Sequence, residues 1–292
     1  MHGHYFVVQS ALDASGDRNG SVHRATCFFR EGTVLDLKHN EAVSVRPFEL
    51  LRRCGGYYKA PRDNDKKLLG PLVGLPNWYL DREGKFQQWV SDAYVDWAVA
   101  EADNVALRAL GWRVFGCISD FRLVHGLDPK RIALCGVPEG GRSFAAVAST
   151  FFQAGVAHIC AETTVTKDAT LCERRQAQFK SFRGDLRSGT EVFLVKDTLA
   201  EDFALTKQLM AEVQNRGARV VAVVALLNSS RTASNVLMFE GVGVPVLPLE
   251  HMPMRAYRQD DEVVKAQVDA GNVVLSPRAE WPRLIAAMEK FP

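Results

Sequence analysis

The chain has 292 residues, 47% of them hydrophobic, and its 36 basic and 34 acidic side chains leave a formal charge of +2. This balance, without a block rich in Lys or Arg, argues against nucleic acid as an obligatory partner. The sequence contains no run of about 18 apolar residues, and its first ten residues lack a signal-peptide pattern, so we expect a cytoplasmic protein that does not associate with membranes.

The first 90 residues predict small, irregular units. Residues 1–48 alternate short apolar runs with turn-like segments, which indicates a β-rich N-terminal extension. The sequence RPFELLRRCGG predicts a short helix that ends at glycine. The Gly- and Pro-rich segment 57–78 predicts loop with at most edge strands. We interpret 49–90 as an irregular subdomain or hood, in which Tyr57, Tyr58, Trp78 and Tyr79 either pack together or cover a ligand.

A regular series of predicted helices and strands begins at Ser91. Residues 91–111 have apolar side chains at helical spacing, with Ser91 as N-cap and Gly111 as the end. The elements expected after this helix are strand 131–137, helix 141–155, strand 157–160, strand 191–197, helix 201–217, strand 218–227 and strand 244–250. The polar stretch 162–190 predicts a loop, and 276–291 predicts a closing helix with Ser276 as N-cap.

These elements predict the fold class. Strands that are apolar throughout and alternate with helices indicate an α/β protein with an open, mostly parallel sheet and helices on both faces. We assign this core to residues 91–250 and a helical C-terminal segment to 251–292. The six cysteines form neither a C-x-x-C pair nor a zinc-type cluster, so we expect reduced, buried thiols.

Two strand-to-helix turns carry the chemically informative residues. In CGVPEGGRS, residues 135–143, a Gly-Gly pair precedes a helix, and such a turn either packs tightly or presents backbone N–H groups to an anion. In the second turn, Asp197 follows the apolar run FLV and is a candidate to accept hydrogen bonds from sugar hydroxyls or to hold Mg²⁺ through water. Ligands of open α/β sheets collect at such carboxyl ends of strands.

Together, the segments RIALCGVPEGGRSFAAVASTFFQAGV and GTEVFLVKDTLAEDFALTKQLMAEVQNRGARVVAVVALLN resemble the type I phosphoribosyltransferases, in the orotate phosphoribosyltransferase-like branch. The resemblance covers roughly 84–250. The first segment is similar to the family's pyrophosphate loop. The second is similar to its diphosphate-sugar signature, in which four apolar residues precede two acids, a small-residue loop and a helix.

The resemblance implies a reaction of phosphoribosyl diphosphate, with Mg²⁺, and a pyrimidine-like or orotate-like base, with release of pyrophosphate. It implies that Val137, Pro138, Glu139, Gly140 and Gly141 hold the pyrophosphate with Arg142 nearby. Asp197 would bind the ribose hydroxyls and Mg²⁺. The residues that match the mobile catalytic loop are Lys167, Arg174 and Arg175. Lys196 and Thr198 would belong to the donor site beside Asp197, and Arg231 would contact the base. The partners implied are small-molecule substrates and, as in the family, a second subunit in a homodimer or heteromer.

The sequence departs from the family pattern at the signature. The first acid of the pair is Lys196, and the phosphate loop contains Glu201 and Asp202. A carboxylate about 4 Å from a 5′-phosphate costs roughly 4 kcal/mol at an effective dielectric near 20. Three hypotheses therefore remain open: an active phosphoribosyltransferase, an impaired relative that binds nucleotides or serves as a partner subunit, and an enzyme whose donor lacks the 5′-phosphate.

Overall fold

The structure is a computed structural model that describes residues 44–138, 140–152, 157–167, 173–179, 186–200, 203–232 and 234–291. The β-rich extension predicted over 1–48 lies outside the described residues except for its last five positions. Within the described ranges, no helix combines the length and apolar composition that a membrane span requires.

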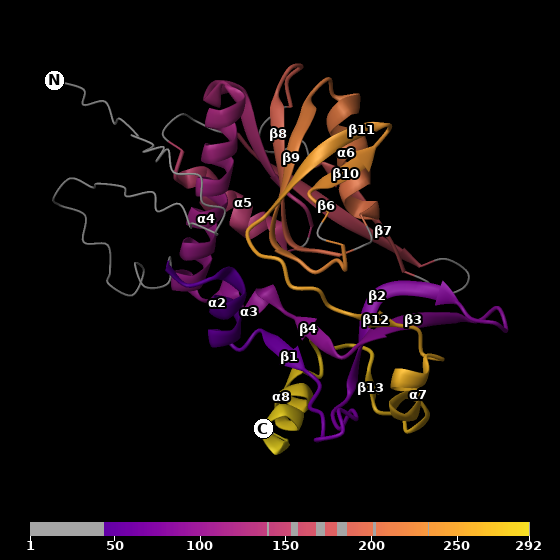
Figure 1. The fold of residues 1–292 in the computed structure, drawn as a ribbon. Helices are drawn as coiled ribbons and strands as arrows, with labels where there is room; N and C mark the ends of the chain where they lie inside the picture. The colour runs from indigo at the N-terminus through magenta and orange to yellow at the C-terminus, as the bar shows by residue number, and fades with distance from the viewer. Residues whose placement is uncertain are drawn as a thin grey trace, which may run out of the picture. The chain divides into compact units, whose positions relative to one another are not determined.

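A seven-stranded sheet with the spatial order β10-β11-β9-β8-β5-β6-β7 forms the centre of the fold (Figure 1). The five inner strands run parallel to their neighbours, whereas β10 and β7 pair antiparallel at the two edges. The strands are β5 Ile132–Gly136, β6 Ala157–Lys167, β7 Glu173–Phe179, β8 Glu191–Leu199, β9 Arg219–Asn228, β10 Val236–Phe239 and β11 Val242–Pro248. The predicted α/β class with a mostly parallel sheet is confirmed.

Helices cover both faces of this sheet. On one face, α4 (Asn104–His125) and α5 (Gly141–Thr150) share a buried core with Leu134 and Phe193. On the other face, α6 (Ala204–Asn215) packs over Cys135 and Leu194. Neighbouring residues of one strand thus enter opposite cores, as the alternation of side chains along a strand requires. Because both faces are covered, the inner strands are apolar along their whole length.

A second sheet has four strands in the order β12-β3-β2-β13. Strands β2 (Leu72–Leu80) and β3 (Phe86–Ser91) come from the predicted hood. The edge strands β12 (Ala256–Tyr257) and β13 (Val273–Val274) come from the C-terminal segment, which also forms α7 (Glu262–Asp269) and α8 (Trp281–Lys290). The remaining elements are α2 Pro47–Arg53, β1 Tyr57–Lys59, β4 Ala93–Val95, α3 Trp97–Ala102 and a 3-10 turn at Pro129–Arg131.

The prediction of loop over 57–78 is wrong for β2, which is an inner strand of the second sheet. Pro76 misled the sequence reading because proline lacks the N–H that a ladder needs. In the structure this proline lies where the β2–β3 register shifts, between Gly74 and Trp78, so the interruption of the ladder falls at the proline. A strand with such an irregularity lacks the clean alternation that would have identified it.

The single helix predicted over 91–111 is also wrong in its bounds. Ser91 ends β3, and its buried hydroxyl donates to the backbone oxygen of Arg255 at 2.7 Å. The helix N-caps are Asp96 for α3 and Asp103 for α4. Gly111 lies inside α4, which runs on to a left-handed Gly126. A Cβ at position 111 would overlap Val147 of α5, so this glycine serves the close approach of two helices and does not end one.

The closing helix begins later than predicted. Residues 276–280 form turns, in which the N–H groups of Ala279 and Glu280 both donate to the oxygen of Ser276. Helix α8 then starts at Trp281, with Pro282 in its first turn. Ser276 is therefore not the N-cap, and Arg278 lies on an irregular segment before the helix.

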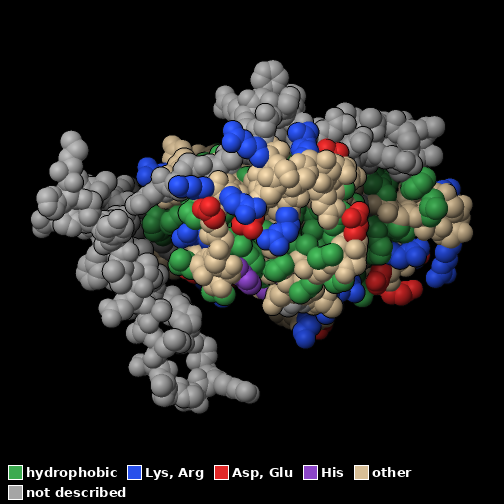
Figure 2. All heavy atoms as spheres, turned by 90° about the horizontal axis from the view of Figure 1, so that it is seen from above, with side chains coloured by type: hydrophobic (Ala, Val, Ile, Leu, Met, Phe, Trp, Pro, Cys, Tyr) green, Lys and Arg blue, Asp and Glu red, His purple; other side chains and the backbone are tan. Residues whose placement is uncertain are grey.

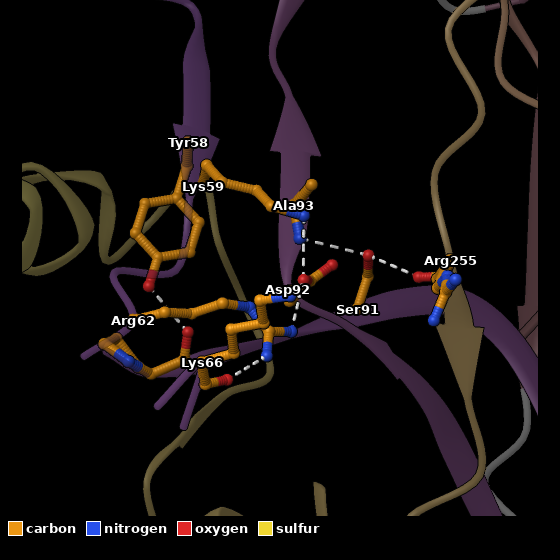
Figure 3. Close-up of polar contacts among 9 residues, drawn as sticks. Tyr58, Lys59, Arg62, Lys66, Ser91, Asp92, Ala93 and Arg255 are labelled. Atoms are coloured by element: carbon orange, nitrogen blue, oxygen red, sulfur yellow. Dashed lines mark hydrogen bonds and ion pairs between the residues drawn. The ribbon is translucent and has the colours of Figure 1, made fainter. Parts of the chain in front are cut away.

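Buried Asp92, between β3 and β4, binds two cations of the predicted hood (Figure 3). Its Oδ2 accepts from Lys59 Nζ at 2.7 Å and from Arg62 Nη2 at 2.8 Å. Burial alone would raise the pKa of Asp92, but the hydrogen bonds and charges of these two cations outweigh it and hold the pKa below its usual range. The neighbouring Tyr58 is buried and donates its hydroxyl to the oxygen of Pro71, so this aromatic residue has a packing role.

The surface of the described residues carries charges of both signs. Figure 2 shows Lys and Arg side chains interspersed with Asp, Glu and apolar side chains on the face seen from above. Among the described cysteines, Cys135 is buried and Cys54 and Cys117 are half-buried, and none of the three forms a disulfide. Burial raises the pKa of Cys117 to about 12, with a smaller contribution from Asp120, so it is a neutral packing residue.

Candidate functional site

The turn between β5 and α5 packs tightly against β8. The N–H of Val137 donates to the oxygen of Val195 at 2.7 Å, and the N–H of Gly141 donates back to the oxygen of Val137 at 3.0 Å. A Cβ at Gly141 would overlap the oxygen of Val195, and one at Gly140 would overlap the carboxylate of Asp197. The glycines therefore allow the turn to approach β8, and they bring the two predicted turns into direct contact.

Strand β8 extends two residues beyond the expected end at Asp197. Its pairing with β9 continues through Thr198 and Leu199, and Leu199 is fully buried. Asp197 is consequently a strand residue. Its Oδ1 accepts the N–H of Thr198 at 2.6 Å, while Oδ2 lies against Gly140. Helix α6 starts at Ala204, and Glu201 and Asp202 of the predicted phosphate loop lie outside the described residues.

Thr198 links β8 to α3. Its Oγ1 accepts the indole N–H of Trp97 at 2.8 Å, and the Trp97 side chain is buried edge-on against Phe144 of α5. Asp96 caps α3 by accepting the N–H of Ala98 at 3.2 Å. These contacts fix a helix of only six residues, which would be unstable in isolation.

A pocket of about 330 Å³ opens where these elements meet. It is lined by side chains and backbone from α3, the β5–α5 turn and the segment before α8, namely Ala98, Glu101, Gly140, Arg142, Ser143 and Arg278. Two cations, one hydroxyl and one carboxyl group thus surround the start of α5. The N-terminal end of a ten-residue helix adds a partial positive charge there. The pocket can accept a ligand that carries both negative charge and hydroxyl groups.

Glu101 is the carboxyl group of this pocket. Its Oε1 is buried and has no hydrogen-bond partner among the described residues. Burial raises the pKa of Glu101 to about 7, and the negative charge of Asp197 adds to the increase, while Arg278 and a hydrogen bond with Ser143 oppose it. The group is therefore near half ionisation at neutral pH. No local motif in the sequence identifies Glu101, because only the packing of α3 against β8 brings it toward Asp197.

Arg278 brings the C-terminal segment to the same pocket. Its Nε lies 3.2 Å from Oδ1 of Asp96. Burial alone would lower the pKa of Arg278, but Asp96, Tyr94 and Asp197 together raise it above its usual value, so the side chain is a fixed cation. Nothing in the run SPRAEW marks this residue, because its role depends on a contact between segments about 180 positions apart.

The structure brings some of the predicted site residues together. Gly140 and Arg142 line the pocket, and Asp197 lies against Gly140. Val137 is buried beneath the turn, and Pro138 follows it. Glu139 lies outside the described residues, and Lys196 is placed on β8 by its pairing with Ala225.

Arg231 belongs to a different pocket. It lines a space of about 460 Å³ with Arg255, Tyr257 and Asp261, and its Nη2 donates to the oxygen of Ala256 at 3.1 Å. The lining of the first pocket does not include it among the described residues. The predicted base contact is therefore not brought beside Arg142 and Glu101.

The loop predicted over 162–190 is wrong for much of its length. Residues 157–167 and 173–179 form β6 and β7, an antiparallel pair at the edge of the main sheet. Lys167 ends β6, and Arg174 and Arg175 pair with Thr166 and Val165. Their polar composition suggested loop, but an edge hairpin tolerates polar residues because water solvates its exposed side. The side chains of all three lie outside the described part.

No protein-family model matches the chain, and no curated protein matches its sequence. Solved structures that resemble it include orotate phosphoribosyltransferase of Mycobacterium tuberculosis H37Rv, with 15% identity, 73% of this chain and 95% of that chain covered, and a TM-score of 0.41. Orotate phosphoribosyltransferase of Aeropyrum pernix is 15% identical, with 70% of this chain and 92% of that chain covered and a TM-score of 0.40. An adenine phosphoribosyltransferase is 11% identical, with 59% of this chain and 94% of that chain covered and a TM-score of 0.35.

Proposed function

We propose that the protein is a phosphoribosyltransferase that binds phosphoribosyl diphosphate in the pocket at the start of α5 and transfers the phosphoribosyl group to a pyrimidine-like base. The observation that carries the proposal is the contact between Asp197 and Gly140, beside a pocket lined by Arg142 and Arg278. It joins a carboxylate suited to sugar hydroxyls with cations suited to a diphosphate.

The chemistry needs few groups from the protein. The bond from the anomeric carbon to pyrophosphate breaks, a bond to a ring nitrogen of the base forms, and the base releases its proton to solvent. Negative charge develops on the departing pyrophosphate, where Arg142 and the N–H groups at the start of α5 would stabilise it. Lys167, Arg174 and Arg175 on the β6–β7 hairpin would supply further positive charge to the leaving group.

Magnesium would enter with the donor. In the described part of the chain, no group of three or more His, Cys, Asp or Glu side chains is placed to hold a metal ion. A magnesium ion on a diphosphate needs only one or two protein carboxylates and keeps several waters. Asp197 is the carboxylate at the turn, so it would hold an ion that neutralises the diphosphate as the donor binds.

The proposed acceptor is a pyrimidine-like base such as orotate. Arg231, its predicted contact, lines the second pocket with Arg255 and is not part of the described lining of the donor pocket, so we do not assign it to the base. We further propose a cytoplasmic homodimer or heteromer that acts on small molecules. Light scattering of the purified protein measures the assembly, and a monomer at all concentrations would exclude the homodimer.

Lys196 favours a second candidate function, a catalytically impaired relative that binds nucleotides or serves as the partner subunit of a heteromer. It occupies the position of the first acid of the signature. This candidate predicts ligand binding without turnover. The double change to Lys196→Glu and Glu201→Gly would be expected to restore turnover if these positions alone caused the impairment.

The test of the proposed enzyme is release of pyrophosphate. The purified protein is incubated with phosphoribosyl diphosphate, Mg²⁺ and a panel of bases that includes orotate, uracil and adenine. We expect release that depends on one base and is lost in Asp197→Asn. Donor binding without release from any base would favour the impaired relative. Neither binding nor release would overturn both candidates.

A further inference from the structure

We propose that Glu101 is a substrate-binding residue that accepts a hydrogen bond from a ribosyl hydroxyl of the donor, beside Asp197, and so supplies from α3 the second carboxylate that the signature lacks at Lys196. This inference rests on the proposed function. It deepens that function by assigning a contact outside the two motifs that the sequence identifies.

The position of Glu101 follows from how α3 is anchored. The helix is capped by Asp96, and Trp97 binds Thr198, the residue after Asp197. Glu101 lies one turn after Trp97 and lines the pocket with Gly140, against which the Asp197 carboxylate rests. Residues four apart lie on one face of a helix, so the Trp97 anchor fixes the face that Glu101 occupies.

The hydrogen-bonding state of Glu101 indicates a missing donor. Its Oε1 is buried without a partner among the described residues, whereas buried polar atoms are usually paired and an unpaired one is costly. Ser143 is the one neighbouring hydroxyl bonded to this side chain in the described part of the pocket. Because Glu101 lines the pocket, a rotation of its carboxylate that turns Oε1 toward the pocket would let a ligand hydroxyl complete the pairing.

The charges around Glu101 determine which ligand suits it. The groups that act on it are Asp197 from β8, Asp96 at the start of α3, Arg278 before α8 and Ser143 of α5. Two further carboxylates disfavour a second anion directly at Glu101, and they favour a neutral hydrogen-bond donor. Vicinal hydroxyls supply two such donors, one for Glu101 and one for Asp197, while the phosphate groups remain near Arg142 and Arg278.

The experiment compares sugar phosphates by calorimetric titration. Ribose 5-phosphate, 2-deoxyribose 5-phosphate and 3-deoxyribose 5-phosphate are titrated into the wild type and into Glu101→Gln. A hydrogen bond to a carboxylate corresponds to an affinity difference of about tenfold. We expect the wild type to prefer ribose 5-phosphate to each deoxy sugar by about this factor. Glu101→Gln keeps only a neutral acceptor, so it should weaken the preference over one deoxy sugar and leave the preference over the other unchanged.

The control is Glu262→Gln, which removes the same charge from an exposed position on α7 and should change neither preference. Glu101→Asp provides a second variant with a retained charge and a shorter reach, and it should weaken the same preference. Unchanged preferences in both Glu101 variants would overturn the inference while leaving the proposed function intact. A wild type that binds neither the sugar phosphates nor phosphoribosyl diphosphate would overturn both.

Discussion

The indole Nε1 of Trp97 donates a hydrogen bond of 2.8 Å to Oγ1 of Thr198, and this contact joins α3 to β8 at the edge of the candidate site. Trp97 is almost completely buried, so its N–H has few alternative partners if this bond is lost. The same bond sets the distance between the two segments that carry Glu101 and Asp197. Stability and ligand binding are thus coupled at one residue pair.

Replacing Thr198 with valine tests this coupling. The change keeps the shape of the side chain and leaves the Trp97 N–H unpaired, which we expect to cost about 1–3 kcal/mol of unfolding free energy. Urea unfolding measures it. Thr150→Val on the exposed end of α5 is the matched control and should cost less. Equal effects of the two substitutions would contradict a special role for the Trp97–Thr198 bond.

Gly141→Ala tests the packing of the turn. The added methyl group would overlap the backbone oxygen of Val195, which cannot rotate away as a side chain can. We expect a loss of about 1–3 kcal/mol in thermal or urea unfolding. In Gly116→Ala, within α4, the added Cβ meets nothing within 4 Å, and this variant should be neutral or stabilised. A tolerated Gly141→Ala would show that the turn does not approach β8 as described.

Asp92→Asn tests the ion pairs that buried Asp92, between β3 and β4, forms with two cations. It removes the charge that Lys59 and Arg62 bind while preserving the size of the side chain. Because both cations are partly exposed, we expect a moderate cost of about 1–2 kcal/mol in unfolding free energy. Asp65→Asn, at an exposed position, should have little effect. The stabilisation by Asp92 should persist at neutral pH and disappear only as pH falls through its lowered pKa.

The raised pKa of Glu101 predicts a pH dependence of the opposite sign. Between its ordinary value of 4.5 and about 7, the folded protein binds more protons at this group than the unfolded chain does. Stability contributed by the protonated group is therefore present below pH 4.5 and is lost as pH rises through about 7. The melting temperature of the wild type should fall more steeply over this interval than that of Glu101→Gln. Parallel curves would show that Glu101 titrates normally.

Sequence reasoning located the main sheet well because buried parallel strands carry a continuous apolar pattern, as in RIALCGV and ARVVAVVALL. It failed at β2, where Pro76 coincides with a register shift, and at Gly111, where a glycine serves helix packing and does not end a helix. Both failures arise because tertiary contacts override the usual local meaning of Pro and Gly.

The residues of the candidate site also fall into two groups: those that a local motif identifies, and those that only tertiary contacts bring to the pocket. The turn at Gly140 and the carboxylate of Asp197 follow from local motifs, so the sequence identifies them. Glu101 comes from α3, before the strands of the main sheet, and Arg278 comes from the C-terminal segment after them, and neither has a local signature. Their place in the pocket follows only from the anchoring of α3 by Trp97 and from the pairing of Arg278 with Asp96.

The most direct test of the account is a calorimetric titration of phosphoribosyl diphosphate with Mg²⁺ into the wild type, Asp197→Asn, Arg142→Ala and the control Arg82→Ala, whose side chain is largely exposed. We expect one saturable site in the wild type and in the control. We also expect affinities about 10- to 100-fold lower in the two pocket variants, since each loses hydrogen bonds that involve a charged group. An absence of binding to the wild type, or wild-type affinity in both pocket variants, would contradict the proposed donor site.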